Sequence, residues 1–399
     1  MKINLPKLPK LELAKVRPFF LGKGLIFAAI ILALLSYQTY SFYQKAQRLE
    51  SEKTDSLTQL EGIKTELETL KNQDQIKRNE QLQEEIENIQ KTYDSAVSTY
   101  EELVKLQESS KDTSEMEKLF AEALSLLSKR NYSDAVKILS TLSAKITEEQ
   151  NKIAASFTIP ENVPTNNAPP GSGYSRQQVS SDAGAFMVSM VAADLGSTRV
   201  IVDTASAGTC TNDCPVLPLA TYVSRNGAYA GVNGSYFCPA TYPSCVGKTN
   251  SFDTLLMNKD KVYFNSDNNV YSNNPAVIFG SGYIRFVSAA SQWGRDTSID
   301  SMISNYPLLV FNGGVSFGGD DDPKKGSKGA RSFVANKGNT IYIGVVHNAT
   351  VAESARVMKA LGMENTLNLD DGGSTALWSG GYKVGPGRDL PNVILFVSK

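Results

Sequence analysis

The spacing of apolar and polar positions is helical in the first part of the chain and β-like in the last part. The first clear feature is residues 24–44, which carry no charged side chain and begin GLIFAAIILALL. An uncharged run of this length is about enough for a helix to cross a hydrocarbon core of ~30 Å. It predicts a transmembrane anchor.

The residues before this run are strongly basic. Residues 1–23 contain six Lys or Arg side chains and a single acid, Glu12. Basic flanks of a membrane span stay in the cytoplasm, so this tail is expected to be cytoplasmic and the chain after residue 44 extracytoplasmic. A cleaved signal peptide is the alternative, but no small-x-small cleavage site follows the apolar run. We therefore expect a single-pass protein of the cell membrane.

Residues 45–113 are expected to form a helical stalk, because they are rich in Glu, Lys, Gln and Leu and contain no Pro. A narrow apolar stripe recurs there at roughly heptad spacing, formed by Leu57, Leu60, Ile63, Leu67 and Leu70. Such a stripe is typical of a coiled coil. The stalk is therefore expected to join copies of the chain into a homo-oligomer, with a single solvated helix as the alternative.

Two further segments precede the last domain. Residues 114–156 show two amphipathic helical patterns around an RNYSD turn, where Ser133 is positioned to cap the second helix. This helical hairpin cannot bury its own apolar face, so it should pack on the stalk or on a neighbouring copy. Residues 157–175 contain four prolines among Gly, Asn and Ser, which is typical of a semi-extended linker.

Residues 176–399 have the pattern of a separate β-rich domain. Short apolar runs with β-branched and aromatic residues are separated by Gly and Asn turns; they include AFMVSMVAA, TRVIVDTA, YIRFV, YPLLVF, RSFVA, TIYIGVV and NVILFV. One helix is expected at Thr350–Leu361, which opens with a capping box of Thr350 and Glu353. The predicted fold class is α+β, with many strands and few helices.

Charge and cysteine usage narrow the function. The formal net charge of −1 gives no overall basic field, so a nucleic-acid partner is not expected. The cysteines cluster in the last domain, at Cys210, Cys214, Cys238 and Cys245. An even, clustered set in an exported chain indicates two disulfides. Three pairings are open, of which we favour the local ones; zinc is the alternative, although the spacings are unusual for it.

The strongest candidate site is the stretch LNLDDGGSTALW, residues 367–378. An apolar strand, preceded by MENT, runs here into Asp370 and Asp371, then Gly372 and Gly373, then the hydroxyls of Ser374 and Thr375. Carboxylates at a strand end can face a cleft, and glycines allow a ligand to approach the backbone closely. The N–H groups of such a turn can also bind an anion. The alternative is an ordinary Asp-Gly turn.

This stretch resembles the LDGGGS signature of the phosphodiester glycosidase family. Further matches follow in the family's order: GVNGSYF at Gly231–Phe237, YPLLVFNGG at Tyr306–Gly314, ARSFVA at Ala330–Ala335 and GRDLPNVILF near the end. Together they run from about residue 180 to the C-terminus. The resemblance implies a hydrolase that cleaves the glycosidic bond of sugars linked through a phosphodiester. The anchor, stalk and hairpin lie outside it.

The resemblance also assigns roles. It implies that Asp370 is the catalytic carboxylate and that the site includes Asn233, Asn368, Gly372, Gly373 and Ser374. Arg331 is the candidate clamp for the phosphate, with Arg388 as a second. Asp371 stands where the family has glycine, and Cys238 where an acid is common. Neighbours on a strand point to opposite faces, so Asp370 and Asp371 are not expected to be a catalytic pair.

The sequence gives weaker support to two other kinds of site, a Ser-His-Asp hydrolase site and a calcium site. The chain has one histidine, His347, and a Ser-His-Asp hydrolase would have to use it with Ser374 or Ser235. DGGST is not a G-x-S-x-G nucleophile elbow. The acids of GGDDDPKKGSKG at 318–329 are hard ligands for calcium, but a solvated loop that covers the site is favoured. No cofactor is expected.

The sequence therefore predicts a membrane-anchored, extracytoplasmic phosphodiester glycosidase that acts on envelope or surface glycans. The alternative is a non-catalytic glycan-binding protein displayed on a stalk, which the substitution at Cys238 favours.

Overall fold

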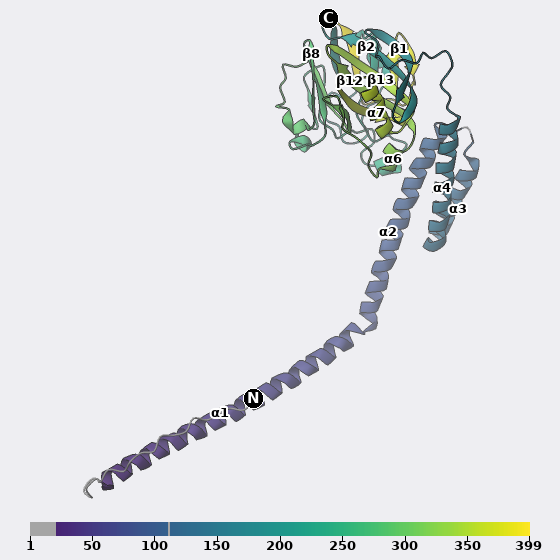
Figure 1. Cartoon of the computed structure of the whole chain (residues 1–399). Coiled ribbons are helices and arrows are strands. Elements are labelled where there is room, and N and C mark those ends of the chain that lie inside the picture. Colours follow the sequence, from purple (N-terminus) through teal and green to yellow (C-terminus); the bar gives the residue numbers. More distant parts are fainter. Residues whose placement is uncertain (1–20, 111) are drawn as a thin grey trace. The chain divides into compact units, whose positions relative to one another are not determined.

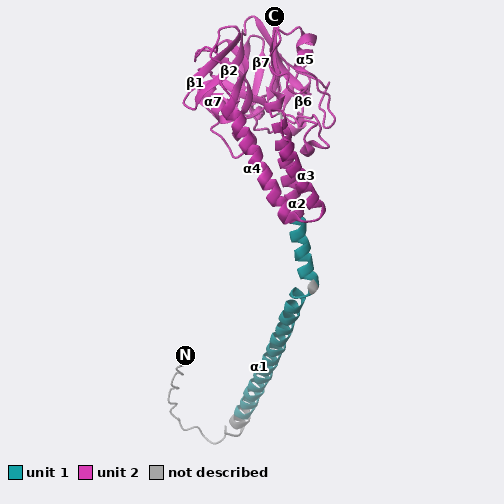
Figure 2. Cartoon of the chain, turned by 90° about the vertical axis from the view of Figure 1, so that its right-hand side faces the viewer, with its two compact units in different colours: residues 1–87 teal, residues 88–399 magenta. Residues whose placement is uncertain are grey.

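The computed structural model describes residues 21–110 and 112–399; the side chains of residues 21–27 and of Asp74 are not described. Most of the basic tail at 1–23 therefore lies outside the described residues. The chain divides into two compact units, residues 1–87 and 88–399 (Figure 2). The boundary falls inside the predicted stalk, so the last part of the stalk belongs to the same unit as the β-rich domain.

The first unit consists of helix α1 (Leu21–Lys71) and the start of α2 (Asp74–Gln107). Among the described residues, no helix combines the length and the apolar character that crossing a membrane requires. The predicted anchor at 24–44 is therefore not supported by the structure.

The predicted coiled coil is also not supported in this single chain. The stripe residues Leu57, Leu60, Ile63, Leu67 and Leu70 lie along α1 and are each at least 45% exposed. They face solvent because the described residues pack no second helix against them. A homo-oligomer stays a prediction.

In the second unit, the C-terminal part of α2 packs against a hairpin of α3 (Ser114–Ser128) and α4 (Tyr132–Ser156) (Figure 1). The apolar contacts join Leu103 and Leu106 of α2 to Leu142 and Ile146 of α4. The hairpin thus covers its apolar face with the same chain. Asn131, not the expected Ser133, caps α4, because its side chain accepts a hydrogen bond from the Asp134 N–H.

The β-rich part of this unit contains three antiparallel sheets. The first has the order β1-β2-β13-β12-β14-β10-β11, with β1 Gly173–Ser181, β2 Gly184–Asp194, β13 Thr340–Ala349, β12 Gly329–Lys337, β14 Asn365–Asp371, β10 Leu308–Phe311 and β11 Gly314–Val315. The second has the order β16-β15-β4-β17-β3, with β16 Tyr382–Val384, β15 Leu377–Ser379, β4 Ala230–Asn233, β17 Asn392–Ser398 and β3 Thr198–Thr204. The third has the order β6-β5-β9-β7-β8, with β6 Tyr263–Phe264, β5 Leu256–Met257, β9 Ser301–Ser304, β7 Ala276–Gly280 and β8 Tyr283–Val287.

One apolar core joins the inner faces of the three sheets, with Val345, Ile394 and Phe279 as fully buried members from the first, second and third sheet. The outer face of the first sheet is covered by α7 (Val351–Ala360), whose Val357 and Met358 are buried against it. Helix α5 (Leu219–Asn226) covers the second sheet. The α+β prediction is confirmed, and so is the capping box that begins α7.

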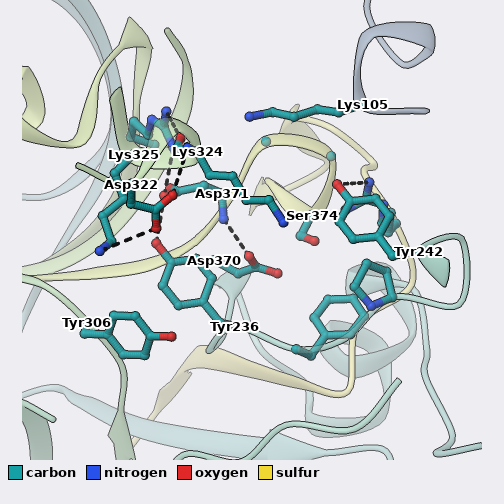
Figure 3. A pocket seen from close by; sticks show the side chains of 16 residues that line it. Lys105, Tyr236, Tyr242, Tyr306, Asp322, Lys324, Lys325, Asp370, Asp371 and Ser374 are labelled. Atoms are coloured by element: carbon teal, nitrogen blue, oxygen red, sulfur yellow. Dashed lines mark hydrogen bonds and ion pairs between the residues drawn. The ribbon is translucent and has the colours of Figure 1, made fainter. Parts of the chain in front are cut away.

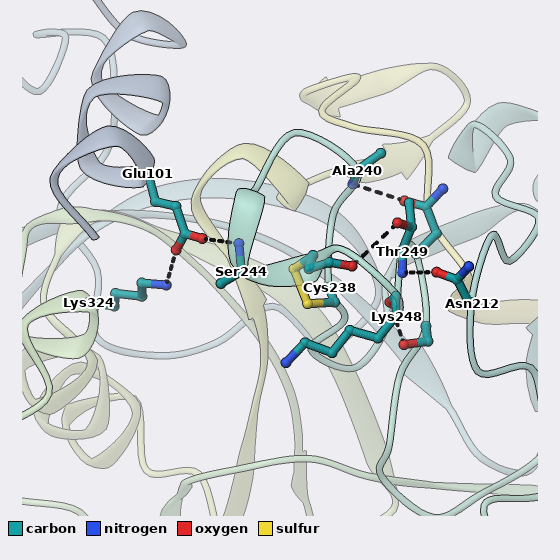
Figure 4. The surroundings of a disulfide bond; sticks show 11 residues. Glu101, Asn212, Cys238, Ala240, Ser244, Lys248, Thr249 and Lys324 are labelled. Carbon is teal, nitrogen blue, oxygen red and sulfur yellow. Dashed lines mark hydrogen bonds and ion pairs between the residues drawn. A yellow bond between two sulfur atoms is a disulfide. The ribbon is translucent and has the colours of Figure 1, made fainter. Parts of the chain in front are cut away.

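Two disulfides join Cys210 to Cys214 and Cys238 to Cys245. This is the local pairing that the sequence favoured, and it leaves no cysteine for zinc. The second disulfide closes a loop against the end of α2, where the Ser244 N–H donates to Glu101 at 3.0 Å (Figure 4).

Candidate active site

The stretch with the two carboxylates ends a central strand of the first sheet. Phe333 of β12 pairs with Asn368 of β14, and Arg331 pairs with Asp371. Three residue steps of β14 therefore lie opposite two residue steps of β12. This is a β-bulge, which breaks the strict alternation of side chains. Asp370 and Asp371 therefore both line one cavity, contrary to the expectation that they point to opposite faces.

That cavity has a volume of about 260 Å³ and is rich in charge (Figure 3). Its charged lining residues are the cations Lys105, Lys324, Lys325, Arg331 and Arg388 and the acids Asp322, Asp370 and Asp371. Aromatic walls come from Tyr236, Phe237, Tyr242 and Tyr306, and the 3₁₀ turn Gly372–Ser374 forms one edge. A cavity with an excess of cations and flat aromatic walls suits an anionic sugar derivative.

Asp370 is the buried carboxyl of the site, with 9% of the residue exposed. Its Oδ1 accepts from the Asp371 N–H at 2.9 Å, and the Ser374 hydroxyl also donates to it. Burial and, to a smaller extent, the charge of Asp371 raise the pKa of Asp370 to about 7, although the hydrogen bonds and Arg388 oppose this rise. A carboxyl with a pKa near neutrality is suited to proton transfer.

Asp371 has a different environment and accepts four hydrogen bonds. Its Oδ2 accepts from Tyr236, Asn368 and Arg331, each at 3.1 Å, and its Oδ1 accepts from the Ser332 N–H at 3.3 Å. With four donors on its carboxylate, Asp371 organises the site wall and is not a free base. The two neighbouring acids are thus distinguished by their surroundings.

Arg331 lines the cavity but has little donor capacity left for a ligand. Its side chain is 4% exposed and pairs with Asp371. Its remaining donors reach the carbonyls of Ala349, Lys324 and Ser327. Arg331 therefore ties β14 to the loop around α6 (Pro323–Gly326), which makes it a poor candidate for the phosphate clamp.

Asn233 and Asn368 are fully buried beneath the site. The Asn233 amide donates to the Asp370 carbonyl at 2.7 Å, and its oxygen accepts from Ser332. The Asn368 amide donates to the Tyr236 hydroxyl at 2.8 Å as well as to Asp371. Neither faces the cavity, so both hold the carboxylates in place instead of contacting a sugar.

Arg388 is the better placed arginine for an anion. It lies over the ring of Tyr242 at 5.1 Å from the ring centroid, and its guanidinium pairs with Glu108 at the edge of the cavity. Only 19% of its side chain is exposed. Because little water screens the guanidinium, its charge attracts an anion in the cavity strongly.

Several lining residues were not found by sequence reasoning. Tyr236 and Tyr242 lie in or next to the quoted GVNGSYF motif, and Lys324 and Lys325 come from the GGDDDPKKGSKG loop. The loop forms part of the cavity wall, which agrees with the prediction that it covers the site. Lys105 gave no local signal, because it lies on a long polar helix.

Two predicted site residues do not line this cavity, although His347 lines an adjoining one with Gly372 and Gly373. His347 bonds to the Ser189 hydroxyl at 3.0 Å and stacks on Phe157, and burial lowers its pKa to about 4. Thr375 is buried and donates to the Ala330 carbonyl. Because the described contacts of Ser374 and Ser235 do not include His347, the geometry provides no Ser-His-Asp triad.

The calcium prediction finds no support in the acidic loop. Asp320 and Asp322 both pair with Lys325. Among the described residues, no group of three or more His, Cys, Asp or Glu side chains could hold a metal ion. Calcium binding stays untested.

Comparison with known proteins gives one informative match. Residues 226–397 match the model of the phosphodiester glycosidase family. Among solved structures, the catalytic domain of zebrafish N-acetylglucosamine-1-phosphodiester alpha-N-acetylglucosaminidase, auto-inhibited by its pro-peptide, is 15% identical, with a TM-score of 0.43 over 59% of this chain and 87% of that chain.

A hypothetical protein from Synechocystis is 14% identical, with a TM-score of 0.41 over 57% of this chain and 62% of that chain, which is less than two thirds of its length. No curated protein matches the chain. At such identities and TM-scores the solved structures carry no functional argument, which leaves the family match and the geometry.

Proposed function

Because residues 226–397 match the phosphodiester glycosidase family, we propose that this protein hydrolyses the glycosidic bond of sugar 1-phosphodiesters. The observation that carries the proposal is Asp370, a buried carboxyl with a pKa of about 7 in a cavity lined by five cations. The substrate class is anionic and carries a sugar, which fits the cations and the aromatic walls.

The chemistry needs only one carboxylate at the reacting carbon. Hydrolysis breaks the bond between the anomeric carbon and the phosphate oxygen, and the leaving group is a phosphate monoester with a second pKa of about 6. Such a group departs without a strong proton donor. The remaining task is to activate water, and an ionised Asp370 with a pKa near 7 can take its proton as a general base.

The other residues have positioning and binding roles in this proposal. Asp371 and Tyr236 hold the wall beside Asp370 through their 3.1 Å hydrogen bond. Arg388 binds the phosphate, and the N–H groups of the Gly372–Ser374 turn add donors for the same anion. This arrangement replaces the Arg331 clamp that the family resemblance suggested.

We propose that the domain works outside the cytoplasm, on phosphodiester-linked sugars of envelope or surface glycans. The two disulfides support an oxidising compartment, because such bonds are rare in the cytosol. Attachment to the membrane rests on the uncharged run 24–44 alone, and recovery of the full chain in the membrane fraction of its host would test it.

The direct test is release of free sugar by the full-length protein from a panel of sugar 1-(methyl phosphate) compounds that vary in sugar and anomer. We expect one or more members to be hydrolysed, with the phosphate monoester as the second product. If the panel binds, as measured by calorimetry, but no member releases sugar, the glycan-binding alternative replaces the enzyme. A covalent serine probe should not label Ser374, because it has no histidine partner.

The disulfide beside the cavity gives a further prediction. Replacing Cys238 and Cys245 by Ser opens an eight-residue loop and should lower the free energy of unfolding by about 2.5 kcal/mol. It should also raise KM, since this loop holds Tyr242 against Arg388. The matched control replaces Cys210 and Cys214, whose loop contributes no residue to the cavity, whereas the 238–245 loop contributes Tyr242.

Thermal unfolding and steady-state kinetics of the two double variants would be compared. Both should lose stability, but only the Cys238/Cys245 variant should lose substrate affinity. An equal KM in the two variants would show that the loop disulfide has no part in the site.

A further inference from the structure

The end of helix α2 reaches the candidate active site from outside the family domain. Its Lys105 lines the cavity together with Asp370, although the family match begins only at residue 226 (Figure 3). The approach depends on Gly373 of the signature stretch, because a Cβ atom there would overlap with the Glu108 carboxylate. A Cβ atom at Gly372 would lie 3.7 Å from the Lys105 Cε, which is an ordinary van der Waals contact.

Lys105 carries a charge that no described carboxylate contacts directly, although the charges of Asp371 and Glu108 act on it from a longer distance. Its ammonium donates to the Ser327 hydroxyl at 3.2 Å, and none of the described residues forms an ion pair with it. It is half-buried, and burial together with the nearby Arg331 lowers its pKa. A partly buried, unpaired ammonium is costly in free energy unless an anion joins it.

Glu108, one turn further along the chain, occupies the position of such an anion. Its carboxylate pairs with Arg388 and lies against Gly373, at the turn where the substrate phosphate is expected. The edge of the cavity thus holds two cations, Lys105 and Arg388. The Glu108 carboxylate lies between the end of α2 and the Gly372–Ser374 turn.

We propose that Lys105 is a substrate-binding residue that contacts the phosphate of the diester together with Arg388. This inference rests on the proposed function and deepens it, because it makes a helix outside the family domain part of the site. Glu108 holds Arg388 in the free protein, and the incoming phosphate competes with it for this cation. A phosphate between Lys105 and Arg388 would leave the sugar on the side of Asp370 and the tyrosines.

The test compares four variants of the full-length protein: Lys105→Met, Lys105→Arg, Glu108→Gln and Lys91→Met. Lys91 is an exposed lysine of the same helix and serves as the matched control. Two quantities are measured: KM and kcat for the best diester of the panel, and the Kd of N-acetylglucosamine 1-phosphate and of inorganic phosphate by calorimetry. The second quantity does not depend on turnover.

Loss of a charge-assisted hydrogen bond should raise KM and Kd of Lys105→Met about tenfold or more, with kcat nearly unchanged, because the contact is present before and during the reaction. Lys105→Arg should retain most of the affinity. Glu108→Gln should bind phosphate more tightly than the unmodified protein, since it removes the competing carboxylate. A merely structural role of Lys105 would not produce opposite effects at these two positions.

The outcomes separate this inference from the proposed function. If sugar is released but Lys105→Met behaves like Lys91→Met, the inference fails and the enzyme stands. If no diester is hydrolysed but the phosphate ligands show the expected order of Kd values, Lys105 is a phosphate-binding residue of a non-catalytic site. If phosphate does not bind to the unmodified protein, the inference is overturned.

Discussion

Asp370→Asn should reduce kcat by a factor of about 10²–10⁴ while leaving substrate affinity nearly unchanged, because the variant keeps the shape of the side chain and loses its capacity to accept a proton. The asparagine oxygen can still accept the hydrogen bond from the Asp371 N–H. The measurement is kcat and KM for the diester that the panel identifies. A variant that retains turnover would remove Asp370 from the chemistry.

The same substitution should make the protein more stable above neutral pH. The folded-state pKa of Asp370, about 7, lies above the ordinary aspartate pKa of 3.8. A raised carboxyl pKa contributes stability that is fully present below the unfolded pKa and is lost as the pH rises through the folded pKa. At pH 8 the wild type must bury an ionised carboxylate, whereas the variant buries a neutral amide, which should stabilise the variant by about 2–4 kcal/mol.

The pH dependence of the wild type checks the assigned role. A general base must be ionised, so kcat/KM should rise as the pH rises through about 7. The rise should disappear in whatever residual activity Asp370→Asn retains. A kcat/KM that falls over this range would instead assign Asp370 as the proton donor to the leaving group.

The element types were largely predictable, because local patterns determine them. The run YIRFV became β8 with the expected bounds, and the capping box of Thr350 and Glu353 begins α7. The hairpin cap was missed by two residues, because Asn131 and Ser133 are both good caps and the turn geometry decides between them. The apolar run and the heptad stripe near the N-terminus predicted an anchor and a coiled coil that the described part of the chain does not support.

The site was only partly predictable. The motif located Asp370 and the glycine turn. Whether each polar side chain lines the cavity or is buried beneath it depends on tertiary contacts. The bulge opposite Arg331 turned both carboxylates to one cavity, which no alternation rule could reveal. Asn233 and Asn368 became buried supports, and Lys105 entered the site from a helix that is more than 250 residues away from Asp370 along the chain.

Arg331 should prove to be a structural residue, in contrast to the clamp that the family resemblance implied. Arg331→Met removes the positive partner of Asp371, and the side chains of this pair are 4% and 9% exposed. Breaking a buried ion pair from one side typically costs about 3–5 kcal/mol, because the remaining charge is left uncompensated. The loop around α6 also loses its anchor, since Arg331 donates to the carbonyls of Lys324 and Ser327.

Thermal unfolding of the full-length protein should therefore show Arg331→Met melting about 6–15 °C lower than the wild type. The matched control is Arg356→Met, which breaks the exposed ion pair with Asp182 and should change the melting temperature little. Substrate affinity separates the two possible roles of Arg331. If Arg331→Met melts like the control but loses affinity for phosphate ligands, Arg331 is the clamp after all, and Arg388 with Lys105 would be secondary. If it melts early while Arg388→Met keeps its stability and loses affinity, the phosphate lies at the glycine turn beside α2.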